Sequence, residues 1–318
     1  MKILFLCFHG LAPDSGVSKK IEAQVDALRS IGHTVWLHTY DVLPDGHRVR
    51  RIDGKTIADF GTTILAPIRK RCCYGAVEQF VCDNAVELVY VRSYHNANPF
   101  TISLFERMRQ SGAKMVVEIP TWPYDQEYEG MPLKYRLNLV IDRMYRRRMA
   151  RAIDAFVTFA PVSEILGQRA ISISNGFAIS PSLTQSEERH DGKVRLLAVA
   201  EVHFWHGFDR AVEGMGLYKG DTPVELHIVG GIATDELLGT DKAKGISTLI
   251  EHYGLHGKVF LHGSLYGEAL EEQFRLADFC IGSLGRHRSG ITAIKTLKNR
   301  EYAARGLAFC YSEQDDDF

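Results

Sequence analysis

Residues 2–40 read KILFLCFHGLAPDSGVSKKIEAQVDALRSIGHTVWLHTY. An apolar run at residues 2–8 leads through a loop into an amphipathic stretch that begins at Val17. Gly32 ends this stretch, and a second apolar run, TVWLHTY, follows at residues 34–40. This order is one complete βαβ unit, and it predicts a parallel sheet with helices packed against it.

The same alternation continues along the chain and predicts an α/β fold. In the first half we expect further strands at TTILAP (62–67), ELVYVRS (87–93), KMVVEIP (114–120), AFVTFA (155–160) and AISISNG (170–176). In the second half we expect them at VRLLAVA (194–200), VELHIVGG (224–231), KVFLHGS (258–264), DFCIGSL (278–284) and AFCYS (308–312). Both halves are therefore expected to be Rossmann-like.

A polar segment separates the two halves. Residues 178–192 lack a hydrophobic period and contain Pro181, so we interpret them as a linker between domains at residues 1–177 and 193–318. A chain of 318 residues also suits two domains. Because open parallel sheets bind ligands at the carboxyl ends of their strands, we expect the two sheets to face a central cleft.

Composition limits the classes of partner and compartment. The net charge is -1, with 45% hydrophobic and 24% charged residues, so there is no basic excess of the kind that binds nucleic acid. The six cysteines show no C-x-x-C spacing, which favours reduced thiols in a cytoplasmic protein. The N-terminal apolar run is too short for a signal peptide or a membrane span. We predict a cytoplasmic protein, and a peripheral role at the inner face of the membrane stays open.

The loop FHGLAPDSG, residues 8–16, is the first candidate for binding. It lacks the G-x-G-x-x-G spacing of a dinucleotide fingerprint. Ser15 and Gly16 at a helix N-terminus can still present N–H groups to a phosphate or a sugar hydroxyl. Ser15 can equally be a plain helix N-cap, and the residues alone leave both roles open.

The stretch VEIPTWPYDQEYEG, residues 117–130, concentrates aromatic and acidic side chains, among them Trp122, Tyr124 and Asp125. Aromatic faces pack on sugar rings, and carboxylates accept hydrogen bonds from hydroxyl groups. We therefore favour an acceptor-binding role. The alternative is a surface loop whose aromatic side chains cover the edge of a core.

Residues 133–153, LKYRLNLVIDRMYRRRMARAI, predict a basic amphipathic helix. An apolar stripe includes Leu137, Ile141 and Met144, and five arginines occupy the rest of the surface between Arg143 and Arg151. Such a helix is typical of a membrane-surface element. The alternative is a solvated arginine-rich face that pairs with nearby acids.

Residues 279–306, FCIGSLGRHRSGITAIKTLKNREYAARG, predict an anion site. A strand ends near Leu284, and Ser289 or Thr292 is expected to cap the next helix. Arg286 and Arg288 just before that helix suit a diphosphate. Ile294, Leu297 and Glu301 fall on one face of the expected helix, so the carboxylate of Glu301 needs a partner, either Lys298 or a nucleotide ribose.

The segment EYAARGLAF, residues 301–309, resembles the E-A-M-A-x-G-x-P segment of the retaining GT-B glycosyltransferases of family four, in a bacterial polysaccharide-biosynthesis branch. Ser15-Gly16 and Asn175-Gly176 match two further segments of that family, and the resemblance covers nearly the whole chain. It implies that the first domain binds an acceptor, that the second binds a nucleotide-sugar donor, and that Glu301 binds the ribose. The implied reaction moves a hexose to a glycan or lipid-linked glycan with retention.

Two segments depart from that family. Ala293 stands where a second, sugar-binding glutamate is usual, and AEVHFWHG (200–207) replaces G-R-L-x-x-x-K-G, with Glu201 for arginine and His206 for lysine. Other cations must then hold the diphosphate. The expected donor-binding residues are Glu301, Arg286, Arg288, Ser289, Gly290, Lys295, His206 and Gly207. Lys298 and His9 are candidates for the catalytic step.

No D-x-D motif in the expected place indicates a metal, so we expect neither a metal nor another cofactor. The acids of the final EQDDDF are expected to be solvated. The GT-B fold normally continues beyond such a segment, so we expect the second domain to be incomplete. The alternatives are a sugar-nucleotide epimerase of similar fold and an inactive nucleotide-binding subunit.

Overall fold

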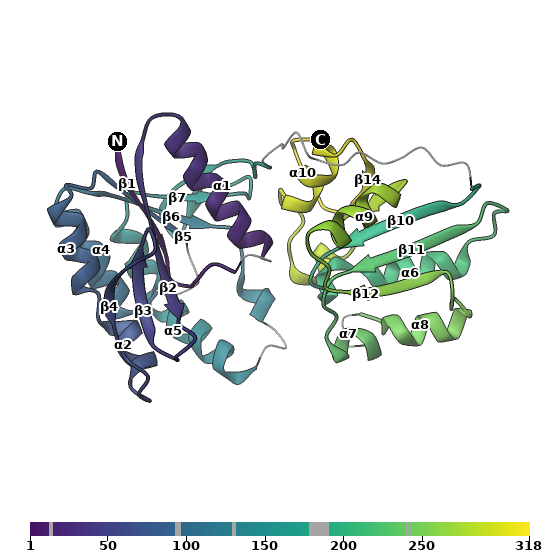
Figure 1. The fold of residues 1–318 in the computed structure, drawn as a ribbon, viewed down its shortest axis with the longest axis horizontal. Coiled ribbons are helices and arrows are strands. Elements are labelled where there is room, and N and C mark those ends of the chain that lie inside the picture. The colour runs from purple at the N-terminus through teal and green to yellow at the C-terminus, as the bar shows by residue number, and fades with distance from the viewer. Residues whose placement is uncertain (13–14, 93–96, 129–131, 178–190, 240, 242) are drawn as a thin grey trace. The chain divides into compact units, whose positions relative to one another are not determined.

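The computed structural model describes residues 1–12, 15–92, 97–128, 132–177, 191–239, 241 and 243–318. Contacts divide the chain into two compact units, Met1–Ile173 and Ser174–Phe318. Residues 178–190 of the expected linker lie outside the described residues. Each unit is an α/β layer structure around its own sheet (Figure 1).

The first unit has a nine-stranded sheet in the order β4-β3-β2-β1-β5-β6-β7-β9-β8. The strands are β1 (Lys2–Cys7), β2 (Thr34–Val42), β3 (Arg48–Ile52), β4 (Lys55–Asp59), β5 (Leu88–Arg92), β6 (Lys114–Ile119), β7 (Ala155–Thr158), β8 (Glu164–Ile165) and β9 (Gln168–Ser172). The helices are α1 (Gly16–Ser30), α2 (Ala66–Cys72), α3 (Gly75–Asp83), α4 (Pro99–Gln110) and α5 (Leu133–Arg151), with a 3₁₀ turn η1 (Asp125–Tyr128). From β2 to β9 all neighbouring strands are parallel.

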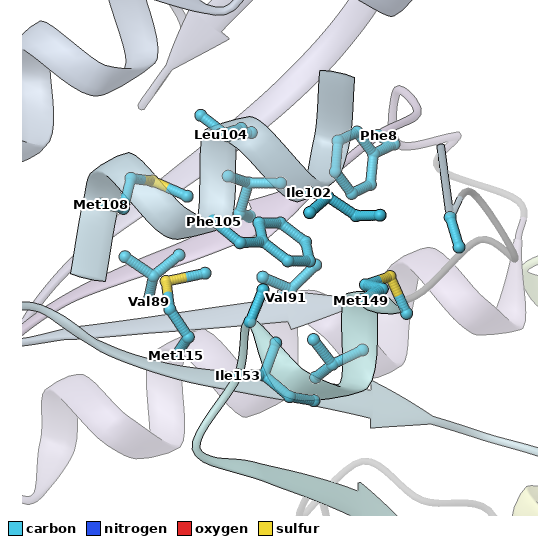
Figure 2. Packing of buried hydrophobic residues seen from close by; sticks show 14 of the residues in the cluster. Phe8, Val89, Val91, Ile102, Leu104, Phe105, Met108, Met115, Met149 and Ile153 are labelled. Atoms are coloured by element: carbon cyan, nitrogen blue, oxygen red, sulfur yellow. The ribbon is translucent and has the colours of Figure 1, made fainter. Parts of the chain in front are cut away.

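The predicted βαβ unit at residues 2–40 is confirmed as β1–α1–β2. Both faces of β1 are buried, which explains its unbroken apolar run. Ile3 and Phe5 pack towards Ile21 and Val25 of α1. Leu4 and its neighbours on the opposite face join a larger core that α3, α4 and α5 cover. Figure 2 shows this core, with side chains from α4 packed over those of β5 and β6.

Two short segments near residues 48–72 differ from the expectation. TTILAP is not a strand, because Ala66 and Pro67 begin α2, and proline is well tolerated in the first turn of a helix. Strands β3 and β4 form an antiparallel hairpin that we did not predict. Its turn is Asp53-Gly54, with φ of 44° and 77°, a common two-residue hairpin turn.

The second unit has five parallel strands in the order β12-β11-β10-β13-β14, all at predicted positions. They are β10 (Val194–Val199), β11 (Val224–Val229), β12 (Val259–Gly263), β13 (Phe279–Ile281) and β14 (Ala308–Cys310). The helices are α6 (Phe208–Leu217), α7 (Thr234–Leu238), α8 (Ile246–Tyr253), α9 (Glu268–Leu276) and α10 (Leu297–Ala304), with 3₁₀ turns η2 (Phe204–His206) and η3 (Arg286–Ser289). Helices α6 and α8 cover one face of the sheet, and α9 and α10 cover the other (Figure 1).

The final residues, 311–318, fold back onto the second unit. The N–H of Ile294 donates to Gln314 O at 3.0 Å, and the N–H of Gln314 donates to Thr292 O at 2.7 Å. Glu313 is only 6% exposed and Asp315 only 5%. The prediction that the acids of EQDDDF are solvated is therefore wrong for these two residues.

Candidate functional site

Loops from three adjacent strands meet at one end of the sheet in the second unit. Strands β10, β13 and β14 are neighbours, and the segments that follow them contain Glu201–Gly207, Gly282–Gly290 and Tyr311–Glu313. The first two loops touch closely, because the N–H of Leu284 donates to His206 O at 2.7 Å. A Cβ on Gly207, whose φ is 66°, would lie 2.6 Å from the nitrogen of Gly285. Only glycine at 207 permits this approach.

His206 is buried behind this contact and is 7% exposed. Its Nδ1 accepts a hydrogen bond from the N–H of His203 at 3.0 Å, so the neutral ring carries its proton on Nε2. Burial, with the nearby charges of Lys298 and Arg286, lowers the pKa of His206 well below its usual value. The residue that replaces the usual lysine is therefore a neutral hydrogen-bond donor, not a cation.

Lys298 lies in the first turn of α10, which begins at Leu297 with Thr296 as its N-cap. The prediction that Ser289 or Thr292 caps this helix is wrong, since Ser289 ends the 3₁₀ turn η3 and its hydroxyl donates to Arg286 O. Lys298 Nζ lies 3.5 Å from Ser283 Oγ, and no salt bridge to it occurs among the described residues. Burial, with the charge of Arg286, lowers the pKa of Lys298 to about 7.

Two cations of the expected donor set, Arg288 and Lys295, have carboxylate partners within the fold. Arg288 binds Asp209 through two hydrogen bonds of 2.8 and 2.9 Å. Lys295 binds Asp317 at 2.8 Å and the Ser174 hydroxyl at 3.0 Å. Arg288 and Lys295 are thus engaged in structural pairs. Arg286 lies close enough to Lys298 for its charge to lower the pKa of that lysine.

Gly290, the remaining residue of the expected donor set on this loop, has a φ of 70° and closes η3. Arg286 begins the same turn, and its guanidinium lies 5.8 Å from the centre of the Trp205 ring. The turn η3 therefore holds Arg286 against η2, on the same side as Lys298 and His206. Arg288 and His287 line a separate hollow of about 820 Å³ beside α6 and α8.

Glu301 lies one turn after Lys298 on α10, and its side chain is 25% exposed. Its partner is Arg305, not Lys298, because Oε1 accepts from Arg305 Nη2 at 2.9 Å. Arg305 also binds Glu271 through bonds of 2.7 and 2.8 Å. Ile294 does not share the face of Glu301, since it precedes the helix. The contacts from Arg305 use Oε1 alone, so Oε2 is not engaged by that arginine.

Glu313 is the buried acid of this region that sequence reasoning missed. Neither carboxylate oxygen has a hydrogen-bond partner in the described part of the chain. Burial raises the pKa of Glu313, and its own backbone N–H, the charges of Lys298 and Arg286 and the backbone N–H of Ser312 partly offset that rise. The region thus holds two cations and one acid that are close in space but not bonded to each other.

In the first unit, the loop after β1 contains Ser15, Gly16 and His9. Ser15 is the N-cap of α1, and its hydroxyl accepts from the Ser18 N–H at 3.4 Å. His9 Nδ1 lies 2.8 Å from Gly10 O, and burial lowers its pKa. The N-cap role of Ser15 is therefore present, while a binding role for Ser15-Gly16 and a catalytic role for His9 stay predictions.

The aromatic and acidic loop after β6 is tied to α5. The Tyr124 hydroxyl donates to Asp142 Oδ2 at 2.6 Å, and Tyr124 is 2% exposed. Asp125 accepts two hydrogen bonds from Arg146, at 2.7 and 3.1 Å. Trp122 is partly buried, edge-on to Tyr124. Tyr124 and Asp125 thus have structural partners, and an acceptor-binding role for this loop stays a prediction.

Helix α5 exposes the apolar stripe predicted for it. Leu137 is 55% exposed, Ile141 42% and Met144 70%. Part of its arginine-rich surface pairs with a local acid, as Arg143 and Arg146 both bind Asp125. None of the described helices is long and apolar enough to cross a membrane. Among the described residues there is also no group of three or more metal-ligating side chains.

A second buried acid, Glu118, lies at the end of β6. It is fully buried and accepts hydrogen bonds from four side chains: Lys20 at 3.2 Å, Gln24 at 3.0 Å, Tyr90 at 2.6 Å and Arg92 at 2.7 Å. Burial raises the pKa of Glu118, but Arg92 and Lys20 outweigh it, so the net shift is downward. This acid is held entirely by its own unit, which indicates a structural role.

No protein-family model and no curated protein matches this chain. Solved structures do match it. Sucrose-phosphate synthase from Thermosynechococcus elongatus is 15% identical, with a TM-score of 0.63 over 97% of this chain and 80% of that chain. An α-glucosyltransferase in complex with UDP and a mismatched 13-mer DNA is 12% identical, with a TM-score of 0.57 over 97% of this chain and 78% of that one.

The apo form of the lipopolysaccharide outer core galactosyltransferase WaaB is also 12% identical, with a TM-score of 0.55 over 98% of this chain and 80% of that chain. At such low identity these likenesses establish the fold alone. The chain therefore has two Rossmann-like α/β units and the GT-B fold of these glycosyltransferases.

Proposed function

We propose that this chain is a retaining glycosyltransferase that moves a hexose from a nucleotide-sugar donor to a glycan or lipid-linked glycan. The main support is Lys298, a partly buried cation at the carboxyl end of the second sheet with no acid in contact among the described residues. A cation withdrawn from water without a counterion is costly, and a bound diphosphate supplies that counterion. Ligands of open α/β sheets bind at this end of the strands.

In the proposed reaction, negative charge builds on the departing diphosphate as the glycosidic bond breaks. Groups fixed where this charge develops lower the barrier more than groups that must reorient. Lys298 and Arg286 supply positive charge, and His206 supplies a neutral donor from Nε2. Binding of the anion favours the charged form of Lys298, so its low pKa in the free protein rises when the donor is present.

A thermal-shift screen of nucleoside diphosphates and nucleotide sugars tests this proposal. A ligand that binds only the folded state raises the unfolding midpoint by mass action. We expect at least one nucleoside diphosphate to do so, and Lys298→Met to abolish the shift. Lys258→Met, at an exposed lysine, is the matched control and should keep it. A flat response of the wild-type protein to every nucleotide would refute the proposal.

For Glu301 we propose the ribose-binding role that the family resemblance implies. Its partial exposure and the availability of Oε2 are consistent with a second partner besides Arg305. The wild-type protein should bind a nucleoside diphosphate about 10-fold or more tightly than its 2′,3′-dideoxy analogue, because a charged acceptor loses its donors. Glu301→Gln should remove most of that preference. Glu268→Gln, at an acid 89% exposed, should leave it intact.

We also propose that α5 contacts an anionic membrane surface through its exposed apolar stripe and its arginines. Buried apolar area and attraction to acidic headgroups both strengthen such binding. The protein should co-sediment with vesicles that contain anionic lipid, and Met144→Asp should weaken this. Leu238→Asp, at another exposed apolar residue, is the control. Equal sedimentation of both variants would argue against the contact.

A further inference from the structure

Five cationic side chains lie close together at one end of the sheet in the first unit. They belong to β3, to the last turn of α2 and to the first turn of α5, and we call them the basic cluster: Arg48, Arg50, Lys70, Arg71 and Lys134. Strand β3 is antiparallel to β2, so Arg48 lies beside Val42 at the carboxyl end of β2. The loop after β1 is at the same end, because the N–H of Tyr40 donates to His9 O at 3.3 Å. The basic cluster is therefore at the end of the sheet where open α/β sheets bind ligands.

Two tyrosines position three of these cations. Lys70 Nζ lies 3.8 Å from the centre of the Tyr40 ring, and Arg48 Nη1 donates to the hydroxyl of the same tyrosine at 3.5 Å. The guanidinium of Arg50, a residue only 1% exposed, lies 4.3 Å from the centre of the Tyr74 ring and donates to Lys70 O. Aromatic faces attract cations but carry no net charge, so these contacts hold the side chains without neutralising them.

The other two members of the basic cluster come from α2 and α5, which meet here. Arg71 Nη1 donates to Asn138 Oδ1 at 3.1 Å, and Lys134 lies four residues before Asn138, on the same side of α5. Arg71 and Lys134 are exposed, and Lys70 is partly exposed. Solvent and a ligand therefore have access to the basic cluster.

No member of the basic cluster forms a salt bridge in the part of the chain that the structure describes. Burial lowers the pKa of Lys70 to about 8, together with the charges of Arg71, Arg50, Arg48 and Lys134. The C-terminus of α2 favours its own cations through the helix dipole, but three of the five belong to other elements. Like charges that are partly withdrawn from water repel one another, and a bound anion with several oxygens supplies the missing counter-charge.

We propose that the basic cluster binds a phosphate or diphosphate group of the acceptor. Such a group presents several oxygens at once, which suits lysine and arginine side chains that converge from different elements. That the anion belongs to the acceptor rests on the proposed function, in which the first unit binds the acceptor. The inference narrows the acceptor to molecules that carry phosphate, either a soluble sugar phosphate or a lipid-linked diphosphate.

Calorimetric titration of the whole chain with pyrophosphate tests the inference. The parent protein for this experiment is Lys298→Met, so that the proposed donor site does not contribute to binding. Adding Lys70→Met or Lys134→Met should weaken pyrophosphate binding, by about 10- to 100-fold for the partly buried Lys70. Adding Lys55→Met, at an exposed lysine of β4 in the same unit, should leave the affinity unchanged. Circular dichroism confirms the fold of each variant. Absence of binding to the parent protein, or equal affinity of the Lys70 and Lys55 variants, would overturn the inference.

Further probes distinguish the sources of the phosphate. Glucose 6-phosphate represents a soluble acceptor and geranyl diphosphate a lipid-linked one, and the probe that Lys70→Met weakens more identifies the source. Sedimentation with vesicles of phosphatidylcholine and phosphatidylglycerol should not depend on Lys70. If Lys70→Met loses vesicle binding and keeps its affinity for pyrophosphate, the basic cluster binds membrane headgroups and the inference is overturned. If the wild-type protein binds no nucleotide but binds pyrophosphate through Lys70, the proposed function fails and the anion site stands.

Discussion

Each unit holds a lysine near a buried glutamate, Lys20 buried and Lys298 partly buried, and the two pairs differ in contact. In the first unit Lys20 Nζ lies 3.2 Å from Glu118, which has three further partners. In the second unit Lys298 and Glu313 influence each other's charge but form no salt bridge. Burial removes water from the charged groups of both pairs. Only in the first pair do ion pairs and side-chain hydrogen bonds within the fold compensate for this lost hydration. A charged group at the carboxyl end of a parallel sheet whose desolvation cost no salt bridge compensates indicates a ligand site.

The largest expected effect is at the bonded pair. Glu118→Gln leaves Lys20 and Arg92 buried without their counterion, which should lower the free energy of unfolding by about 3–5 kcal/mol. Urea denaturation at neutral pH measures this. Asp26→Asn, at an acid 74% exposed, should change it by less than about 0.5 kcal/mol. Equal stability of Glu118→Gln and the wild-type protein would remove the distinction between the pairs.

Next in size is the effect of Lys298 on binding. Lys298→Met should weaken binding of a nucleoside diphosphate about 10- to 100-fold, because a charge-assisted contact is lost. It should not lower the free energy of unfolding, since no ionic partner of Lys298 is left unpaired. A variant that loses stability but keeps its affinity would show that Lys298 is structural, like Lys20.

Protonation of Lys298 gives a related measurement. With a pKa of about 7, this lysine is largely neutral at pH 8.5, and a bound diphosphate restores its charge. Nucleotide binding at pH 8.5 should therefore take up close to one proton, which titrations in buffers of different ionisation enthalpy detect. At pH 6 the uptake should nearly vanish, and in Lys298→Met it should be absent at both values.

The two glutamates should respond to pH with opposite signs. The pKa of Glu118 is lowered, so its contribution to stability is present above its unfolded value and is lost as the pH falls through its folded value. The pKa of Glu313 is raised, so the wild-type protein should lose stability relative to Glu313→Gln as the pH rises from its unfolded value through its folded one. Denaturation curves of both variants from about pH 2.5 to 7 compare the two slopes, with the Glu118 effect below its unfolded pKa and the Glu313 effect above its own.

The smallest effect concerns Glu313→Gln at neutral pH. Removing a buried charge that lacks a hydrogen bond should leave the free energy of unfolding unchanged or raise it by about 1 kcal/mol. A loss comparable to that of Glu118→Gln would mean that Glu313 supports the fold, and the contrast between the pairs would then disappear.

Strands buried on both faces were the easiest feature to predict, because they leave uninterrupted apolar runs in the sequence. The hairpin β3–β4 was missed because Arg48, Arg50 and Arg51 hide its alternation, although Asp53-Gly54 is a usable turn signal. The apolar residues of TTILAP were assigned to a strand, and the proline among them begins a helix instead.

At the site, sequence spacing placed Lys298, Arg286 and His206 in one region but could not show which cations are already paired. Arg288 binds an acid 79 residues away, and no local pattern reveals such a pair. The same limit applied at the end of the chain. In the sequence, Ala293 indicates only that the usual glutamate is missing. The fold shows that Ala293 forms a parallel β-bridge with Gln314, the residue that follows the buried Glu313.

The contact between Gly207 and Gly285 has a consequence for mutational scanning. Backbone atoms meet on both sides, since a Cβ on Gly285 would in turn lie 3.0 Å from Gly207 Cα. A side chain at either position would push η2 and η3 apart and displace His206 and Arg286 together. A scan that scores activity would thus rank both glycines with the ligand-binding residues. No second substitution elsewhere could rescue them, because there is no side chain in the contact to shorten.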